Sequence, residues 1–210
     1  MKRIDNFNLG DIVNRTESNA NDVQKEVLKD NQEYILNNSG IPKRYLKAEF
    51  KAINKNQDKL IAGLRENFNG KKFEDIRDML ILGDIGTGKT HLTLAMLLKL
   101  ASANIYCRYA TEHNLLDLYF QKRYEEFEAF KKVNVLAIDE VGKRELQDWQ
   151  KIQIEELISY RYNEMLPTIF ITNLTSKEFK EFLGDRIVSR MRENKVKTIL
   201  MTGEDLRGKI

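Results

Sequence analysis

Residues Gly83 to Thr90, with the sequence GDIGTGKT, have the types and spacing of a loop that binds phosphate groups. Gly83, Gly88, Lys89 and Thr90 satisfy the pattern G-x-x-x-x-G-K-[ST]. Gly86 and Gly88 lack Cβ atoms, so successive backbone N–H groups can converge on phosphate oxygens. The Lys89 ammonium would then reach the β- and γ-phosphates, and the Thr90 hydroxyl would bind Mg²⁺. The pattern predicts a site for a nucleoside triphosphate. Further contacts with the nucleotide are expected from the loop residues Asp84, Ile85 and Thr87 and from His91 at the start of the next helix.

A pair of acids, Asp139 and Glu140, follows a second apolar run in VNVLAIDEVG. A buried strand here would deliver Asp139 to its carboxyl end, beside the phosphate loop, where the carboxylate can hold Mg²⁺ through water. Glu140 could polarise the attacking water. The alternative is that the two acids only end a strand and cap the next element. Asp139 and Gly142 also match the D-x-x-G switch of GTPases. A GTPase needs an N-K-x-D motif that reads guanine, downstream of the phosphate loop. The nearest match (54–58) lies upstream of that loop and has the wrong spacing, so a GTPase is disfavoured.

Two later positions carry polar groups that suit the same chemistry. Asn173 ends the apolar run TIFITN and would emerge beside Asp139 in a parallel sheet, able to touch the γ-phosphate or the water. Arg186 and Arg190 are four residues apart, hence on one face of a helix. An arginine aimed at a neighbouring subunit's γ-phosphate can stabilise charge in the transition state. The alternative for Asn173 is a turn after the strand, and the alternative for Arg186 and Arg190 is an exposed basic helix face.

The elements that must position these residues alternate along the chain. Strands are expected over the short apolar runs 79–83, 104–110, 133–139, 168–173 and 198–203, and helices over 90–101, 112–130 and 147–165. Strands that are apolar on both faces and separated by helices imply a parallel sheet covered on both sides. The sequence therefore predicts an α/β domain.

Composition excludes several other classes of protein. A net charge of +3 over 210 residues is compatible with nucleic acid binding through a local patch but does not argue for it. Cys107 is the only cysteine, which rules out an intramolecular disulfide and a cysteine-rich zinc site. No apolar run approaches the length of about 18 residues that a membrane span needs, and the N-terminus lacks a signal peptide's apolar core. We expect a cytoplasmic protein without membrane contact, with a short, mostly helical appendage at 1–54 and the α/β domain with the nucleotide site at 55–210.

The motifs together resemble a known family. The segments GTGKTHL, IDEVG, FITNLTSKEF and LGDRIVSRMR, in this order, are similar to the AAA+ ATPases of the DnaC/DnaI helicase-loader group and the related IstB transposition helpers. SGIPKRY (39–45) is similar to the opening segment of that group, so the match covers most of the chain. The resemblance implies a three-layer P-loop fold of the AAA+ type with a five-stranded parallel sheet in the order 5-1-4-3-2. It also implies that the C-terminal helical lid usual in AAA+ proteins is missing.

The resemblance assigns roles residue by residue. It implies Walker A roles for Lys89 and Thr90 and Walker B roles for Asp139 and Glu140. It also implies a sensor 1 role for Asn173 and an arginine-finger role for Arg190, with Arg186 beside the finger. Arg207 is implied to lie near the nucleotide. ATP and Mg²⁺ are the implied cofactors. One departure concerns the zinc module that loaders of the DnaI kind tend to carry, which a single cysteine cannot make. Helicase docking in this group lies largely in the N-terminal region, which is short here.

The function implied by the resemblance is loading of a replicative hexameric helicase onto single-stranded DNA by ATP-dependent oligomers. A transposition helper like IstB, acting on duplex DNA, is the second hypothesis. A small-molecule kinase is disfavoured, because no lid or acceptor-site signature is found.

Binding of single-stranded DNA needs basic side chains and stacking rings. In the helix expected over 112–130, four apolar residues follow helical spacing and are expected to face the sheet, namely Leu116, Phe120, Tyr124 and Phe127. The candidate DNA contacts lie off this stripe or follow the Walker B acids, and they are Tyr119, Lys122, Arg123, Lys143 and Arg144. A solvated helix face is the alternative for both groups.

Overall fold

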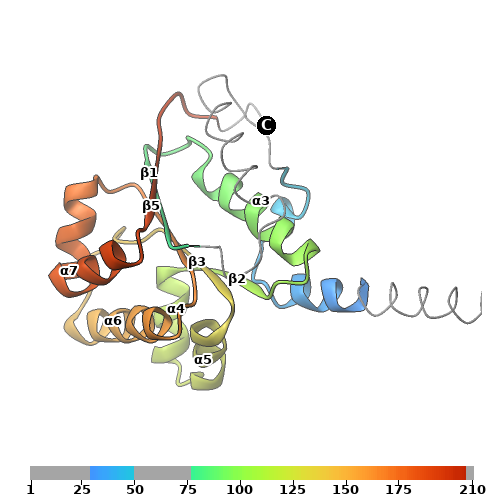
Figure 1. Cartoon of the computed structure of the whole chain (residues 1–210), viewed down its shortest axis with the longest axis horizontal. Helices are drawn as coiled ribbons and strands as arrows, with labels where there is room; N and C mark the ends of the chain where they lie inside the picture. The colour runs from blue at the N-terminus through green and yellow to red at the C-terminus, as the bar shows by residue number, and fades with distance from the viewer. Residues whose placement is uncertain (1–28, 50–76, 207–210) are drawn as a thin grey trace, which may run out of the picture.

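The sheet has the predicted architecture. A computed structural model describes residues 29–49 and 77–206, and its five parallel strands lie in the order β2-β3-β4-β1-β5 (Figure 1). This is the expected order 5-1-4-3-2, counted from the opposite edge. The strands are β1 (Met79–Gly83), β2 (Cys107–Thr111), β3 (Val135–Asp139), β4 (Thr168–Thr172) and β5 (Lys197–Met201). The predicted three-layer AAA+ fold is therefore confirmed.

Helices cover both faces of the sheet, as Figure 1 shows. The buried apolar side chains form two clusters, one on each face of the sheet. The side chains of β1 contribute to both, because successive side chains of a strand point to opposite faces. Ile81 packs on the side of α3 (Lys89–Ser102), and Leu80 packs on the side of the remaining long helices. Those helices are α4 (Glu112–Phe120), α5 (Tyr124–Lys132), α6 (Asp148–Asn163) and α7 (Ser176–Glu193).

One predicted helix is two helices. The stretch 112–130 breaks at Gln121–Arg123, where Lys122 adopts a left-handed backbone with φ 60°. The expected stripe facing the sheet was therefore wrong in part. Leu116 and Phe127 are buried, but Phe120 is 72% exposed and Tyr124 49% exposed. The break changes the direction of the chain, so helical spacing across it no longer describes one face.

The described segment 29–49 packs onto the domain that contains the sheet. Residues 29–37 are helical, and a short 3-10 helix, η1 (Lys43–Tyr45), follows. Ile35 and Ile41 are buried in the cluster beneath α3. The predicted boundary at residue 54 lies outside the described residues, so the division into 1–54 and 55–210 stays a prediction.

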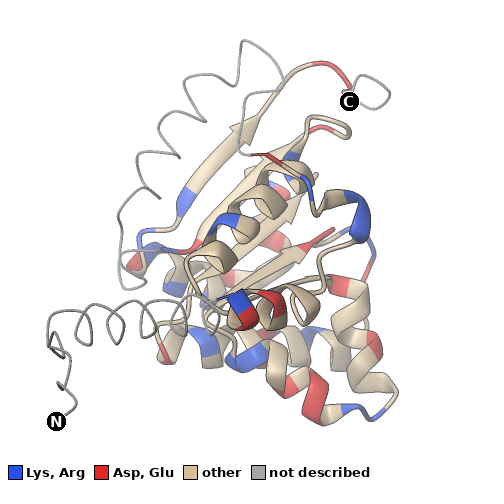
Figure 2. Cartoon of the chain, turned by 90° about the vertical axis from the view of Figure 1, so that its right-hand side faces the viewer, with Lys and Arg blue, Asp and Glu red and all other residues tan. Residues whose placement is uncertain are grey.

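Two surface properties bear on function. Within 29–49 and 77–206, no helix is both long and apolar enough to cross a membrane. Along the ribbon in Figure 2, positions of basic and acidic residues alternate within the described elements.

Candidate nucleotide-binding site

The phosphate loop lies between β1 and α3, as predicted. Gly83, Gly86 and Gly88 all have positive φ, and a Cβ on Gly83 would lie 1.9 Å from the Met201 carbonyl oxygen of β5. Glycine at position 83 is thus required for the sheet to close beside the loop. Lys89 is buried, and its ammonium donates to the carbonyl oxygens of Gly83 (2.7 Å) and Asp84 (2.6 Å). The loop therefore curls around the lysine at the amino end of a helix, where the helix dipole favours anions.

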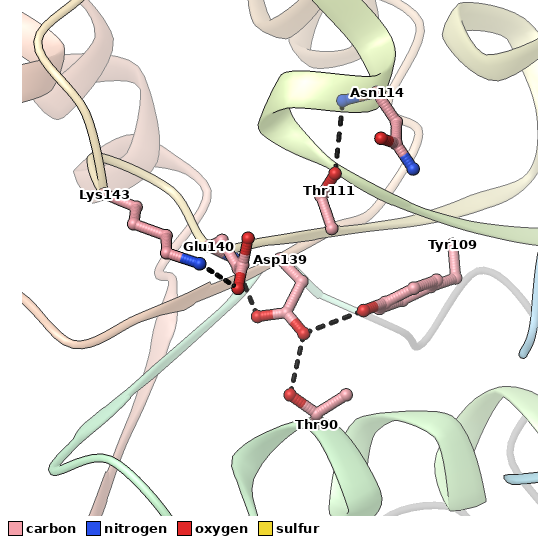
Figure 3. A network of polar contacts seen from close by, with 7 residues as sticks. All are labelled: Thr90, Tyr109, Thr111, Asn114, Asp139, Glu140 and Lys143. Carbon is pink, nitrogen blue, oxygen red and sulfur yellow. Dashed lines mark hydrogen bonds and ion pairs between the residues drawn. The ribbon is translucent and has the colours of Figure 1, made fainter. Parts of the chain in front are cut away.

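Thr90 and Asp139 meet, although 49 residues separate them (Figure 3). The Thr90 hydroxyl donates to Asp139 Oδ2 at 2.7 Å, and Asp139 Oδ1 accepts the Glu140 N–H at 2.7 Å. Asp139 is only 6% exposed. A hydroxyl and a carboxylate are hard oxygen donors, which suit Mg²⁺. The two residues that sequence reasoning assigned to the metal thus lie side by side.

Tyr109 is a third member of this group that sequence reasoning missed. Its hydroxyl donates to the same Asp139 Oδ2 at 2.9 Å (Figure 3). Burial, followed by the nearby Asp139 carboxylate, raises the pKa of Tyr109, so the phenol keeps its proton and remains a donor. No local motif marks this tyrosine, because its role depends on the pairing of β2 with β3.

Glu140 and Asn173 reach the same edge of the sheet. Glu140 has a left-handed backbone with φ 58°, and its carboxylate forms an ion pair with Lys143 Nζ at 2.6 Å. Asn173 is exposed and directly follows β4, which lies between β3 and β1. The start of the loop after Glu140 is fixed to β4, since Val141 N–H donates to the Ile171 carbonyl and the Thr172 hydroxyl donates to the Val141 carbonyl. Asp139, Glu140 and Asn173 are therefore held at the same end of neighbouring strands.

The predicted arginines lie on α7. Arg186 is 69% exposed and pairs with Glu155 of α6 at 2.7 Å. Arg190 donates to the Ser159 hydroxyl, and its guanidinium carbon lies 5.4 Å from the centroid of the Tyr162 ring. Arg207 lies outside the described residues. The finger role of Arg190 stays a prediction that requires a second subunit.

The candidate DNA contacts are arranged differently from the prediction. Tyr119 is half-buried, with ring contacts to Tyr124 and Phe127. Tyr119 also stacks on Trp149, with ring centroids 6.3 Å apart, and exposed Phe120 stacks on the same ring at 6.2 Å. The Arg123 guanidinium donates two hydrogen bonds to the Glu126 carboxylate, of 2.6 and 2.5 Å. Lys122 is exposed and lies in the turn between α4 and α5. The expectation for Tyr119 arose from a continuous helix, which the chain does not form.

A cavity of about 330 Å³ lies between α4 and the loop after Glu140. Its lining includes Phe120, Trp149, Lys143 and Arg144. Glu112 also lines it and is 4% exposed. Its Oε2 accepts the Gly142 N–H at 3.3 Å, and its Oε1 has no hydrogen-bond partner within 29–49 and 77–206. Burial raises the pKa of Glu112 to about 7. Aromatic, basic and acidic groups thus converge beside the loop that follows Glu140.

Comparison with known proteins identifies the family. A family model described as IstB-like ATP binding protein matches residues 31–193, which is most of the chain. The chain belongs to this family. Membership implies nucleotide binding and ATPase activity, in agreement with the resemblance stated from the motifs.

Relatives of the chain include named helicase loaders. It is 28% identical over 184 residues to the replicative helicase loader DnaC of Buchnera aphidicola subsp. Acyrthosiphon pisum, covering 75% of this chain and 68% of that one. It is 26% identical over 152 residues to DnaC of Escherichia coli K12, covering 69% and 60%. The uncharacterized protein YqaM of Bacillus subtilis is 32% identical over 140 residues, covering 61% of this chain and 45% of YqaM. The chain thus spans between about half and two thirds of these relatives.

Solved structures agree with the family assignment. A crystal structure of the DnaC helicase loader has a TM-score of 0.67 at 24% identity, covering 78% of this chain and all of that one. A DnaI structure has a TM-score of 0.66 at 26% identity, covering 79% and 93%. These likenesses place the IstB-like chain in the AAA+ fold of helicase loaders.

Proposed function

We propose that this chain is an ATP-hydrolysing helicase loader that delivers a replicative hexameric helicase onto single-stranded DNA. The observation that carries its ATPase chemistry is the 2.7 Å contact between the Thr90 hydroxyl and the Asp139 carboxylate beside the phosphate loop. The relatives named as replicative helicase loaders support the choice of partner.

The site residues divide the chemistry among them. The loop N–H groups and Lys89 bind the β- and γ-phosphates, and Thr90 and Asp139 hold Mg²⁺, which when bound offsets the charge of the transferred phosphoryl group. Glu140 orients and deprotonates the attacking water, with Asn173 as its neighbour at the strand edge. In the single chain the Glu140 carboxylate is paired with Lys143, so Glu140 acts as a base once that pair opens. Hydrolysis by isolated subunits is therefore slow.

Single-stranded DNA binds at the cavity beside the Walker B loop. Exposed Phe120 stacked on Trp149 offers a platform for a base, and Lys143 and Arg144 lie at the same cavity for the phosphates. Base stacking on an aromatic ring is worth about 1–3 kcal/mol, so this platform is a better candidate than half-buried Tyr119. Lys122 and Arg123, in the turn after Phe120, are the candidates for extending the contact.

ATP-dependent oligomers and a docking appendage complete the proposal. Arg190 can act as a finger only when a second subunit presents its phosphate loop, with Arg186 beside it. Residues 1–54 are the proposed helicase-docking appendage, and 55–210 the proposed ATPase domain. The buried Ile35 and Ile41 suit this arrangement, because they attach the appendage to the core beneath α3.

A transposition helper is the second candidate, because the matching family model is described as IstB-like. This function predicts a preference for duplex DNA.

Stimulation of ATP hydrolysis by single-stranded and by duplex DNA distinguishes the helicase loader from the transposition helper. Steady-state turnover of the full chain is measured with single-stranded DNA and with the matching duplex. We expect greater stimulation by single strands, and loss of most of it in Phe120→Ala combined with Trp149→Ala. Met165→Ala removes an equally exposed apolar side chain that follows α6 and is expected to behave as wild type. A preference for duplex would instead support the transposition helper.

The partner is tested by capture of the full chain, tagged at its C-terminus, from its native extract with ATP and Mg²⁺. Recovery of a hexameric replicative helicase, lost when residues 1–28 are removed, is the expected result. That truncation retains Ile35, so the core cluster stays complete. Recovery of a transposase would overturn the loader function while leaving the ATPase chemistry intact.

A further inference from the structure

The Asp139 carboxylate is held by more than the phosphate-loop threonine. Its Oδ2 atom accepts two hydroxyl donors, Thr90 at 2.7 Å and Tyr109 at 2.9 Å. A carboxylate oxygen has two lone-pair directions in its plane, so two donors of this kind fix the rotation of the group. Figure 3 shows the two hydroxyls approaching the same oxygen from different elements, α3 and β2.

Tyr109 is itself fixed by the segment that precedes the ATPase core. β2 is an edge strand, and the Tyr109 N–H donates to the Ser39 carbonyl oxygen at 2.7 Å. Ser39 is fully buried, and its hydroxyl donates to the Leu36 carbonyl and accepts the Ile41 N–H. Residues 39–41 therefore cover this part of the sheet edge with a fixed turn.

Gly40 makes this approach possible. Its φ is +72°, and a Cβ at this position would lie 2.3 Å from the Tyr109 carbonyl oxygen. A real Cβ needs more than 3.0 Å, so any side chain at position 40 must push the turn and the strand apart. The same segment also contacts the first turn of α3, where Tyr45 makes an edge contact with His91, ring centroids 6.3 Å apart.

We propose that Tyr109 is a positioning residue of the nucleotide site, which orients the Asp139 carboxylate toward Mg²⁺ and makes that orientation depend on the Ser39–Tyr45 segment. The inference rests on the proposed ATPase function. A partner that shifts the segment 39–45 would in this way change the affinity for Mg²⁺ without touching the phosphate loop.

The test is the Mg²⁺ dependence of nucleotide binding, measured by fluorescence of a labelled ATP analogue at increasing Mg²⁺. In Tyr109→Phe we expect unchanged binding without Mg²⁺ and a rise of about tenfold in the Mg²⁺ concentration at half-saturation, the size of effect typical for loss of a ligand-orienting hydrogen bond. Tyr106→Phe removes an exposed hydroxyl just before the same strand and is the matched control, expected to titrate as wild type.

A second variant keeps the proposal testable if the ring change disturbs folding. Gly40→Ala leaves every hydroxyl in place but displaces the Tyr109 backbone, and we expect its Mg²⁺ midpoint to rise in the same direction. Unfolding midpoints without nucleotide show whether each variant is folded at the assay temperature.

Two results would overturn the inference in distinguishable ways. Mg²⁺ midpoints of Tyr109→Phe and Gly40→Ala equal to that of wild type would remove the positioning role and leave the ATPase intact. Absence of Mg²⁺-dependent nucleotide binding in the wild-type chain would overturn the ATPase function and the inference together.

Discussion

Lys89 is the side chain on which we expect phosphate binding to depend most directly. It is already buried within the loop, with two carbonyl oxygens within 2.7 Å, so its position is set before a nucleotide arrives. Lys89→Ala removes charge-assisted contacts worth about 1.5–3 kcal/mol each. We expect nucleotide affinity to fall by roughly 100-fold or more, measured by anisotropy of a labelled ATP analogue. Lys99→Ala, in the last turn of the same helix, is the control. Affinity within a few-fold of wild type in Lys89→Ala would remove the phosphate-loop assignment.

Glu112 gives stability a dependence on pH. Burial raises its pKa from 4.5 to about 7 in the folded chain, so between these values the folded state binds more protons than the unfolded state. Its contribution is therefore fully present below about pH 4.5 and is lost as pH rises through about 7. The shift corresponds to a loss of roughly 3 kcal/mol.

Chemical denaturation at pH 5 and pH 8 tests this assignment. Glu112→Gln should remove most of the fall in unfolding free energy between these values, whereas Glu145→Gln, exposed in the same cavity lining, should not. Parallel pH profiles for wild type and Glu112→Gln would contradict the prediction.

Among elements, the junction of α5, α6 and the starts of β3 and β4 depends on one buried arginine. Arg161 is 1% exposed. Its guanidinium donates to the carbonyl oxygens of Phe130, Lys131, Val133, Asn134 and Pro167 and to the Thr168 hydroxyl. The last carbonyls of α5 have no partner within their own helix, whereas the Pro167 carbonyl also accepts the Leu136 N–H.

Arg161→Met should therefore lower the free energy of unfolding by about 3–5 kcal/mol, because several buried carbonyls lose their donor. Arg161→Lys should recover only part of this, since one ammonium cannot replace a planar fork. Urea denaturation measures both, with exposed Arg192→Met as the control. A loss below 1 kcal/mol in Arg161→Met would show that water replaces the guanidinium.

At the scale of the whole molecule, the finger prediction requires an assembly. Within one chain Arg190 is engaged by Ser159 and Tyr162 of α6, so it must change partner when a second subunit docks. Arg190→Ala should keep nucleotide affinity and lose the rise of turnover with protein concentration. Arg192→Ala, two residues further on and exposed, should keep that rise.

Mixing two inactive variants tests whether Arg190 acts across the subunit interface. Glu140→Gln lacks the base but presents Arg190, and Arg190→Ala lacks the finger but keeps Glu140. We expect the mixture to hydrolyse ATP several-fold faster than either variant alone. A mixture no faster than its components would place Arg190 outside the active site.

Local spacing by itself determined the nucleotide loop, the five strands and the end of the strand that carries Asp139. Glycines, a lysine and apolar runs act within a few residues of one another, so their pattern is readable without the fold. The strand order came from the resemblance, and the α/β alternation agrees with it.

Only the tertiary structure decided which side chains complete the site. Tyr109 and Asp139 are 30 residues apart and meet because β2 pairs with β3. Phe120 stacks on Trp149 of α6, 29 residues further along the chain, and stays exposed because a left-handed backbone at Lys122 ends the helix that the pattern had predicted to continue. The buried Glu112 likewise depends on the loop that follows Glu140. Contacts of this kind depend on packing between distant segments, which residue types and spacing along the chain do not encode.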